Sequence, residues 1–130
     1  MNHKIERALS HKKWVVLGAS ANQERYGYKI LKRLADLEYD VIPVSPNYDE
    51  ILGIPVIKSL SQLPDDEFVL NVVVNKKILR SEWEKVDFSQ FKYIFLQPGT
   101  WDDKTIEDLK KINPELIYNR CILVETNHMQ

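Results

Sequence analysis

Short apolar runs alternate along the chain with longer segments in which apolar residues recur every three or four positions. The runs have the length of strands, and most are rich in Val and Ile: Trp14–Leu17, Val41–Val44, Phe68–Val74, Tyr93–Leu96 and Cys121–Val124. Because these runs are continuously apolar, we expect both faces of each strand to be covered, as in a parallel sheet with helices on each side.

The segments between the runs predict helices, each with one apolar stripe and one polar face. These helices are expected at Tyr28–Glu38, Asn75–Val86 and Asp103–Ile112, with a further short helix in the first ten residues. Between Ile54 and Pro64 we expect a sixth, edge strand through Pro55–Ile57 and a one-turn helix capped by Ser59. The alternation predicts a three-layer, doubly wound parallel α/β sheet of the Rossmann-like type, with strand order 3-2-1-4-5-6.

Length and composition limit the function classes. The 130 residues have room for one domain, which we expect to span 1–130 with residues 1–12 as an N-terminal helical extension. The 18 Lys and Arg against 19 Asp and Glu give a formal net charge of −1, so a nucleic-acid partner is not expected. The apolar runs are shorter than a membrane span. The single cysteine, Cys121, and the lack of a charged-then-apolar leader predict a cytoplasmic protein.

The loop between the first strand and the first amphipathic helix is the strongest candidate for chemistry. Gly18 permits a tight turn off the strand, and the small residues Ala19 and Ser20 allow backbone N–H groups to approach an anion. Gly27 lies where the helix begins, and Arg25 precedes it. This pattern predicts a pyrophosphate cradle, although both glycines also suit an ordinary turn and helix entry.

The end of the second strand argues against NAD. An NAD site uses an acidic residue there to bind the ribose hydroxyls. Here the strand runs into Val44-Ser45-Pro46-Asn47, and Asp40 lies at its opposite end. Val44 and Pro46 are equally compatible with an apolar ledge for an adenine ring and with a plain strand exit.

An ordered set of motifs resembles the small stand-alone CoA-binding domain proteins and, more distantly, the CoA-binding domain of the succinyl-CoA synthetase α subunit. The resemblance runs from about Trp14 to Glu125. The motifs that carry it are Val15–Ser20, Arg25–Ile30 (which includes Tyr26), Val44–Asn47, Ile51–Val56, Ser59–Leu60 with Leu63–Pro64, Leu96–Gly99 and Asn119–Cys121.

The resemblance implies a domain that binds coenzyme A, or an acyl-CoA, across the carboxyl ends of its strands. It implies that Gly18, Ala19 and Ser20 touch the phosphates, with Arg25, Tyr26 and Gly27 in the same loop region. It places Val44, Ser45, Pro46 and Asn47 beside the nucleotide, and Gln97 and Pro98 near the thiol end.

Two positions depart from the family pattern. Ser45 stands where the family usually has Asn, and Val74-Asn75-Lys76 stands where relatives carry a proline-containing or Phe-Arg sequence. Lys76, with Lys77 and Arg80, is as compatible with a contact to the 3′-phosphate as with a solvated helix face.

No catalytic constellation stands out. The histidines His3, His11 and His128 lie outside the expected crevice, no metal-ligand spacing occurs, and Cys121 suits a buried small side chain better than a reactive thiol. We therefore expect a CoA-binding module without catalysis of its own and with an unknown protein partner. The alternatives are an NAD(P)-binding oxidoreductase or small acyl-CoA enzyme, and an interaction protein whose nucleotide crevice has decayed.

Overall fold

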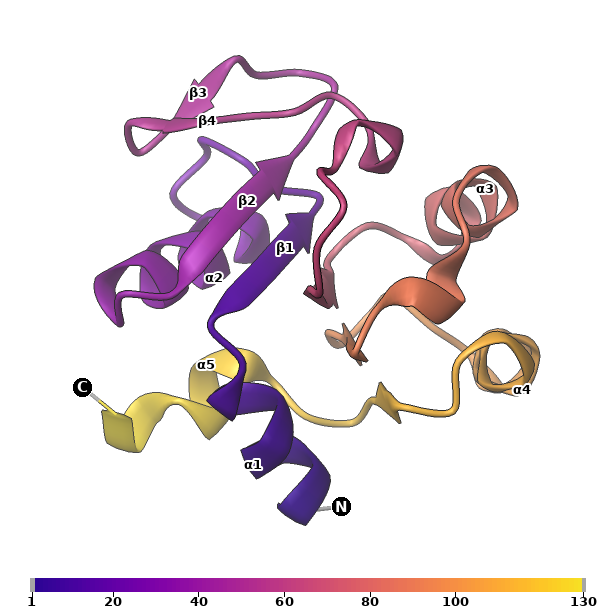
Figure 1. Ribbon diagram of the computed structural model, residues 1–130. Coiled ribbons are helices and arrows are strands. Elements are labelled where there is room, and N and C mark those ends of the chain that lie inside the picture. The colour runs from indigo at the N-terminus through magenta and orange to yellow at the C-terminus, as the bar shows by residue number, and fades with distance from the viewer. Residues whose placement is uncertain (1, 130) are drawn as a thin grey trace.

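Parallel strands form the central sheet of the computed structural model, which describes residues 2–129 (Figure 1). The order of this five-stranded sheet is β2-β1-β5-β6-β7. The strands are β1 (Lys13–Leu17), β2 (Asp40–Val44), β5 (Val69–Val72), β6 (Tyr93–Leu96) and β7 (Leu116–Ile117). The predicted fold class, a doubly wound Rossmann-like α/β sheet, is confirmed, although the strand order differs in detail.

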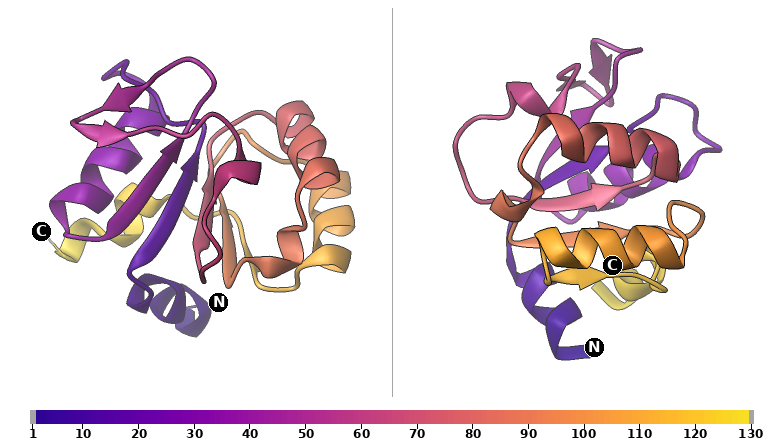
Figure 2. Two further views of the ribbon diagram at one scale, coloured as in Figure 1. Left: turned by 45° about the horizontal axis from the view of Figure 1, so that its top comes forward. Right: turned by 90° about the vertical axis from the view of Figure 1, so that its right-hand side faces the viewer.

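Helices cover both faces of the sheet (Figures 1 and 2). One face carries α2 (Tyr26–Asp36) and α5 (Ile122–Glu125), and the other carries α3 (Lys76–Lys85) and α4 (Asp103–Ile112). The helix expected in the first ten residues is α1 (Asn2–Ser10), and Met1 lies outside the described residues. None of the described helices combines the length and apolar character needed to cross a membrane.

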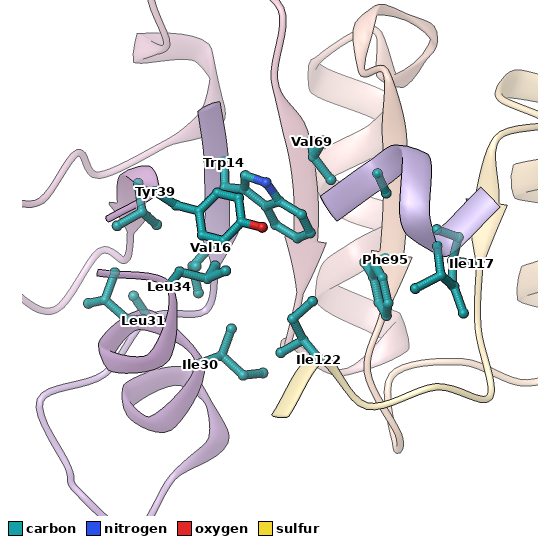
Figure 3. Close-up of a cluster of buried hydrophobic side chains, with 14 of the residues drawn as sticks. Trp14, Val16, Ile30, Leu31, Leu34, Tyr39, Val69, Phe95, Ile117 and Ile122 are labelled. Atoms are coloured by element: carbon teal, nitrogen blue, oxygen red, sulfur yellow. The ribbon is translucent and has the colours of Figure 1, made fainter. Parts of the chain in front are cut away.

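Alternate residues of β1 enter two separate cores. Trp14 and Val16 pack toward α2 and α5 (Figure 3), whereas Val15 and Leu17 pack toward α3 and α4. All four side chains are buried, as the continuous apolar run predicted. This strand therefore sits at the centre of the hydrophobic core.

The last strand is not where the sequence pattern placed it. The run Cys121–Val124 was expected to be a strand, but it contributes to the helix α5, with Cys121 at the N-cap. Ile122 is buried whereas Val124 is 67% exposed, so the run has the one-sided burial of a helix. The strand that completes this edge is β7, with Leu116 and Ile117 paired to β6.

The opposite edge also differs. Instead of one edge strand through Pro55–Ile57, β3 (Glu50–Ile51) and β4 (Ile54–Pro55) form an antiparallel pair, and only Ile57 makes a parallel bridge to Val44. Pro43 explains the short contact. Its carbonyl accepts from the Ile57 N–H at 3.1 Å, but it has no N–H to return toward that edge.

Three short 3₁₀ helices complete the described elements: η1 (Leu60–Gln62), η2 (Phe88–Gln90) and η3 (Asn127–Met129). The Ser59 Oγ accepts a hydrogen bond from the Ser61 N–H at 3.2 Å, so the expected Ser59-capped turn is present. This turn follows Ile57 and Lys58, and the bridge between Ile57 and Val44 places them at the carboxyl end of the sheet next to β2.

Candidate ligand-binding site

Two glycines let the loop after β1 meet the first turn of α2. A Cβ on Gly27 would lie 2.2 Å from the Gly18 carbonyl oxygen, a distance that no side-chain carbon tolerates. Gly18 has a φ of +98°, and a Cβ there would lie 2.8 Å from Val73 Cγ2 and 2.9 Å from Val74 Cγ1. The glycines therefore allow the β1–α2 loop, the start of α2 and the β5–α3 connection to converge.

The backbone donors of this loop differ from the simplest expectation. The N–H groups of Gly18 and Ala19 both donate to the Val44 carbonyl, at 3.0 and 3.3 Å. They thus tie the loop to the end of β2. Within the described residues, the Ser20 N–H and the Tyr26 and Gly27 N–H groups in the first turn of α2 have no acceptor. Anion binding by this loop would depend on these donors.

Serine side chains shape the two neighbouring turns. The Ser20 Oγ accepts from the Asn22 N–H at 3.0 Å, and the Ser45 Oγ accepts from the Asn47 N–H at 3.2 Å. The Tyr48 hydroxyl lies 3.4 Å from the Ser20 Oγ and so connects the loops after β1 and β2. Both serines are almost fully buried, which keeps the small turns close to the strand ends.

The opposite wall comes from the loops after β5 and β6. The Asn75 side chain caps α3 by accepting from the Ile78 N–H at 2.9 Å. After β6, the Thr100 N–H and hydroxyl both bond to the Gln97 carbonyl, which closes a tight turn over Pro98 and Gly99. The loops after four strands thus face one another at the carboxyl end of the sheet, the position where open α/β sheets bind ligands.

These loops enclose a pocket of about 840 Å³. The predicted site residues that line it are Gly18, Ala19, Ser20, Arg25, Val44, Ser45, Pro46, Asn47, Val74, Asn75 and Pro98. The pocket is also lined by Leu17, Tyr48, Lys58, Ser59, Val73, Ile78, Glu82, Lys85, Gly99 and Thr100, which were not among the predicted site residues.

Four predicted site residues do not line the pocket. Gly27 is buried, and Tyr26 is 49% exposed. Lys76 donates to the Asp102 carboxylate at 2.8 Å. Gln97 is buried and spans two elements, because its Nε2 donates to Asn71 Oδ1 at 2.8 Å and its Oε1 accepts from the Ile122 N–H at 3.0 Å.

The charges at the pocket are mostly positive. Arg25, Lys58 and Lys85 line it together with one carboxylate, Glu82. By contrast, Lys76 and Arg80 on α3 form ion pairs with Asp102 and Asp108, away from the pocket lining. The Lys76 ammonium and the Thr105 side chain hold the pKa of the Asp102 carboxyl well below its usual range.

The sequence contains a signal for Lys58, which lines the pocket but was not among the predicted site residues. An edge strand through Ile57 was expected there, and a residue that follows a parallel strand emerges at the same edge of the sheet as the other strand ends. The Ile57–Val44 bridge places Lys58 accordingly. Ile78, Glu82 and Lys85 follow the helical spacing of α3, but the sequence does not show which side of that helix faces the pocket.

Comparison with known proteins identifies the family of this chain. A family model described as the CoA binding domain matches residues 12–127. The chain belongs to this family. The resemblance to CoA-binding domain proteins seen in the sequence is thereby confirmed.

Relatives of the CoA-binding domain occur both in long chains and in short ones. The acetate–CoA ligase (ADP-forming) of Methanocaldococcus jannaschii is 28% identical over 122 residues, which are 88% of this chain but 17% of the ligase. The uncharacterized protein YneT of Bacillus subtilis is 26% identical, and the match covers 93% of this chain and 90% of YneT. The solved structure of a conserved hypothetical protein from Pyrococcus furiosus has 37% identity and a TM-score of 0.81, covering 88% of this chain and 99% of that one.

The nucleophilic and metal-binding candidates lie apart from the pocket of this CoA-binding domain. Neither Cys121, which is partly buried, nor any of His3, His11 and His128 lines it. Among residues 2–129 there is no group of three or more His, Cys, Asp and Glu placed to hold a metal ion.

Proposed function

We propose that this chain binds coenzyme A or an acyl-CoA in the pocket at the carboxyl ends of its strands, and that it does so without catalysis of its own. The observation that carries the proposal is the convergence, in a chain of the CoA-binding domain family, of four strand-end loops and the α2 N-cap residue Arg25 on one pocket of about 840 Å³. A volume of this size suits a ligand of several linked groups.

The residues fit the parts of coenzyme A. The Ser20 N–H and the Arg25 guanidinium would hold the pyrophosphate beside the partial positive charge of the α2 N-terminus, because helix N-termini and charge-assisted hydrogen bonds favour phosphate oxygens. Val44, Pro46 and Ile78 would pack against the adenine or the pantetheine arm. Bound coenzyme A supplies a thiol that carries acyl groups as thioesters.

The proposal of a binding role rests on the chemistry of the pocket lining. Its described residues include a single carboxylate, Glu82, and neither a histidine nor a cysteine to act as base or nucleophile. An NAD site is also disfavoured, because no carboxylate lines the pocket at the end of β2. The ligase relative contains the matching region as a small part of its length, which is consistent with a module that contributes binding.

Calorimetric titration with CoA, acetyl-CoA, ADP and NAD tests the proposal. We expect CoA to bind more tightly than ADP or NAD. At about 100 times its dissociation constant, CoA should stabilise the fold by about 2.7 kcal/mol. For a domain of this size, that corresponds to a rise in melting temperature of roughly 10 °C.

A pair of arginine variants locates the site. Arg25→Gln should weaken CoA binding by about tenfold through the loss of a charge-assisted hydrogen bond to phosphate. Arg7→Gln is the matched control, because Arg7 is also exposed but lies on α1 and does not line the pocket. If neither CoA nor acetyl-CoA binds to the wild type, the proposal is wrong, and equal weakening by both variants would remove the assignment of Arg25.

A further inference from the structure

The residues at the end of β2 determine how a nucleotide-binding sheet recognises the ribose of its ligand. In dinucleotide-binding folds, an acid at this position binds free ribose hydroxyls, whereas a nearby cation accommodates a phosphate on the ribose. In this chain the lining residues at the end of β2 are Ser45, Pro46 and Asn47, which are uncharged. The cation Lys58 lies beside them.

Backbone hydrogen bonds hold Lys58 against the end of β2. The Ile57 N–H donates to the Pro43 carbonyl at 3.1 Å, and the Ser45 N–H donates to the Ile57 carbonyl at 3.0 Å. The Lys58 N–H donates to Gln62 Oε1 at 2.7 Å. The position of Lys58 relative to the strand end is therefore set by the fold rather than by a flexible tether.

The Lys58 ammonium group is also positioned at its tip. It donates to the Tyr48 carbonyl and, at 2.7 Å, to Asp49 Oδ1. Both acceptors belong to the loop that leaves β2, so the positive charge stays over this end of the pocket. An ammonium carries three donors, which leaves one for a ligand while both of these bonds persist.

We propose that Lys58 is the specificity-determining cation that makes the pocket select nucleotides whose ribose carries an additional phosphate, so that coenzyme A binds in preference to its 3′-dephospho form. This inference rests on the proposed function, because it assigns one group of the same ligand.

The other cations are placed less well for this role. Arg25 belongs to the start of α2, beside the donors expected to hold the pyrophosphate. Lys76 and Arg80 are paired with Asp102 and Asp108, and neither lines the pocket. Lys85 lines it, but from the last turn of α3, where a lysine also interacts favourably with the helix C-terminus.

Asp49 opposes the additional phosphate. Its side chain is 95% exposed and shares the Lys58 ammonium with any anionic ligand. Asp49→Asn removes the negative charge and retains an oxygen acceptor. We therefore expect this variant to bind CoA more tightly, with no change for 3′-dephospho-CoA.

The experiment is calorimetric titration of the full chain with CoA and with 3′-dephospho-CoA. The wild type should prefer CoA by about tenfold, the effect of one exposed charge-assisted hydrogen bond. Lys58→Met should abolish that preference and leave the affinity for 3′-dephospho-CoA unchanged. Lys32→Met is the matched control, because Lys32 also forms an exposed 2.7 Å pair with an aspartate but lies outside the pocket lining.

The outcomes separate the two proposals. If neither nucleotide binds, the proposed function fails, and this inference fails with it. If the wild type binds both forms equally, only the inference fails. If Lys58→Met weakens both ligands to the same extent, Lys58 supports the loop rather than recognising a phosphate. Loss of the preference in Lys85→Met but not in Lys58→Met would overturn the assignment as well.

Discussion

Replacing Gly27 by Ala tests whether the close approach of α2 to the loop after β1 builds the pocket. Helix propensity alone predicts that this change stabilises the protein by up to about 1 kcal/mol, because Gly27 lies within α2. The local packing predicts the opposite sign. The added Cβ would lie 2.2 Å from the Gly18 carbonyl oxygen and 3.2 Å from Ala19 Cα.

The magnitude follows from what can move. A carbon and an oxygen in such a contact normally stay about 3.3 Å apart, so the backbone must shift by roughly 1 Å. Gly18 resists the shift, since its N–H donates to the Val44 carbonyl and the space beside it, where a Cβ would point, is filled by the Val73 and Val74 side chains. Overpacking of this kind costs about 1–3 kcal/mol or more. After the gain in propensity, we expect a net loss of about 2 kcal/mol, a fall in melting temperature of roughly 7 °C.

Thermal denaturation with and without CoA provides the assay. Gly27→Ala should lower the melting temperature and also reduce the shift caused by CoA, because the first turn of α2 moves away from the loop. Gly53→Ala is the control. It makes the same chemical change in open space at a φ of +76°, so it costs backbone strain of about 1–2 kcal/mol but should keep the CoA shift intact. A Gly27→Ala protein with an unchanged or higher melting temperature would refute the steric reasoning.

Two further predictions concern groups outside the pocket lining. Gln97→Met should lower the unfolding free energy, measured in urea, by about 2–3 kcal/mol, because it leaves the buried Asn71 Oδ1 and the Ile122 N–H without these partners. The double variant with Asn71→Leu should lose less unfolding free energy than the sum of the two single changes. Strict additivity would contradict the proposed coupling between the two side chains. Asp102→Asn keeps a side chain able to cap α4 but removes the charge that pairs with Lys76. Because the folded-state pKa of Asp102 lies well below its usual 3.8, the carboxylate stabilises the fold fully above that pH, and this stabilisation is lost progressively as the pH falls from there through the folded-state pKa. The stability difference between wild type and Asp102→Asn should therefore shrink between pH 6 and pH 3, and a difference that grows on acidification would contradict this assignment.

The centre of the fold was predictable and its edges were not. β1 and β6 are recognisable in the sequence as continuous apolar runs, because helices cover both of their faces. The edge strand β7 has two residues, too few for any periodicity, and the apolar run after it has the length of a strand although it forms α5. At the other edge, Pro43 restricts pairing to a single bridge, so the expected strand through Ile57 contracts to one contact.

The site, too, was predictable only in part. Topology and loop chemistry pointed to Gly18, Ser20 and Val44, which do line the pocket, because the carboxyl ends of parallel strands meet at one edge of the sheet. The side-chain partners of Gln97 and Lys76 come from Asn71 and Asp102, each 26 residues away in the chain. Partners at that separation leave no local pattern, so the sequence could not show that these two side chains are already engaged.

The short edges of the sheet affect how this protein can associate with other chains. An exposed edge strand offers unpaired N–H and C=O groups, on which strands of other chains can assemble. Here one edge is the two-residue β7, and the other is β2, where Pro43 lacks a donor and the segment through Ile57 lies alongside. Neither edge provides a ladder long enough to template a foreign strand. We therefore expect strand addition and edge-to-edge aggregation to be disfavoured, and associations of this chain to use its helices and loops.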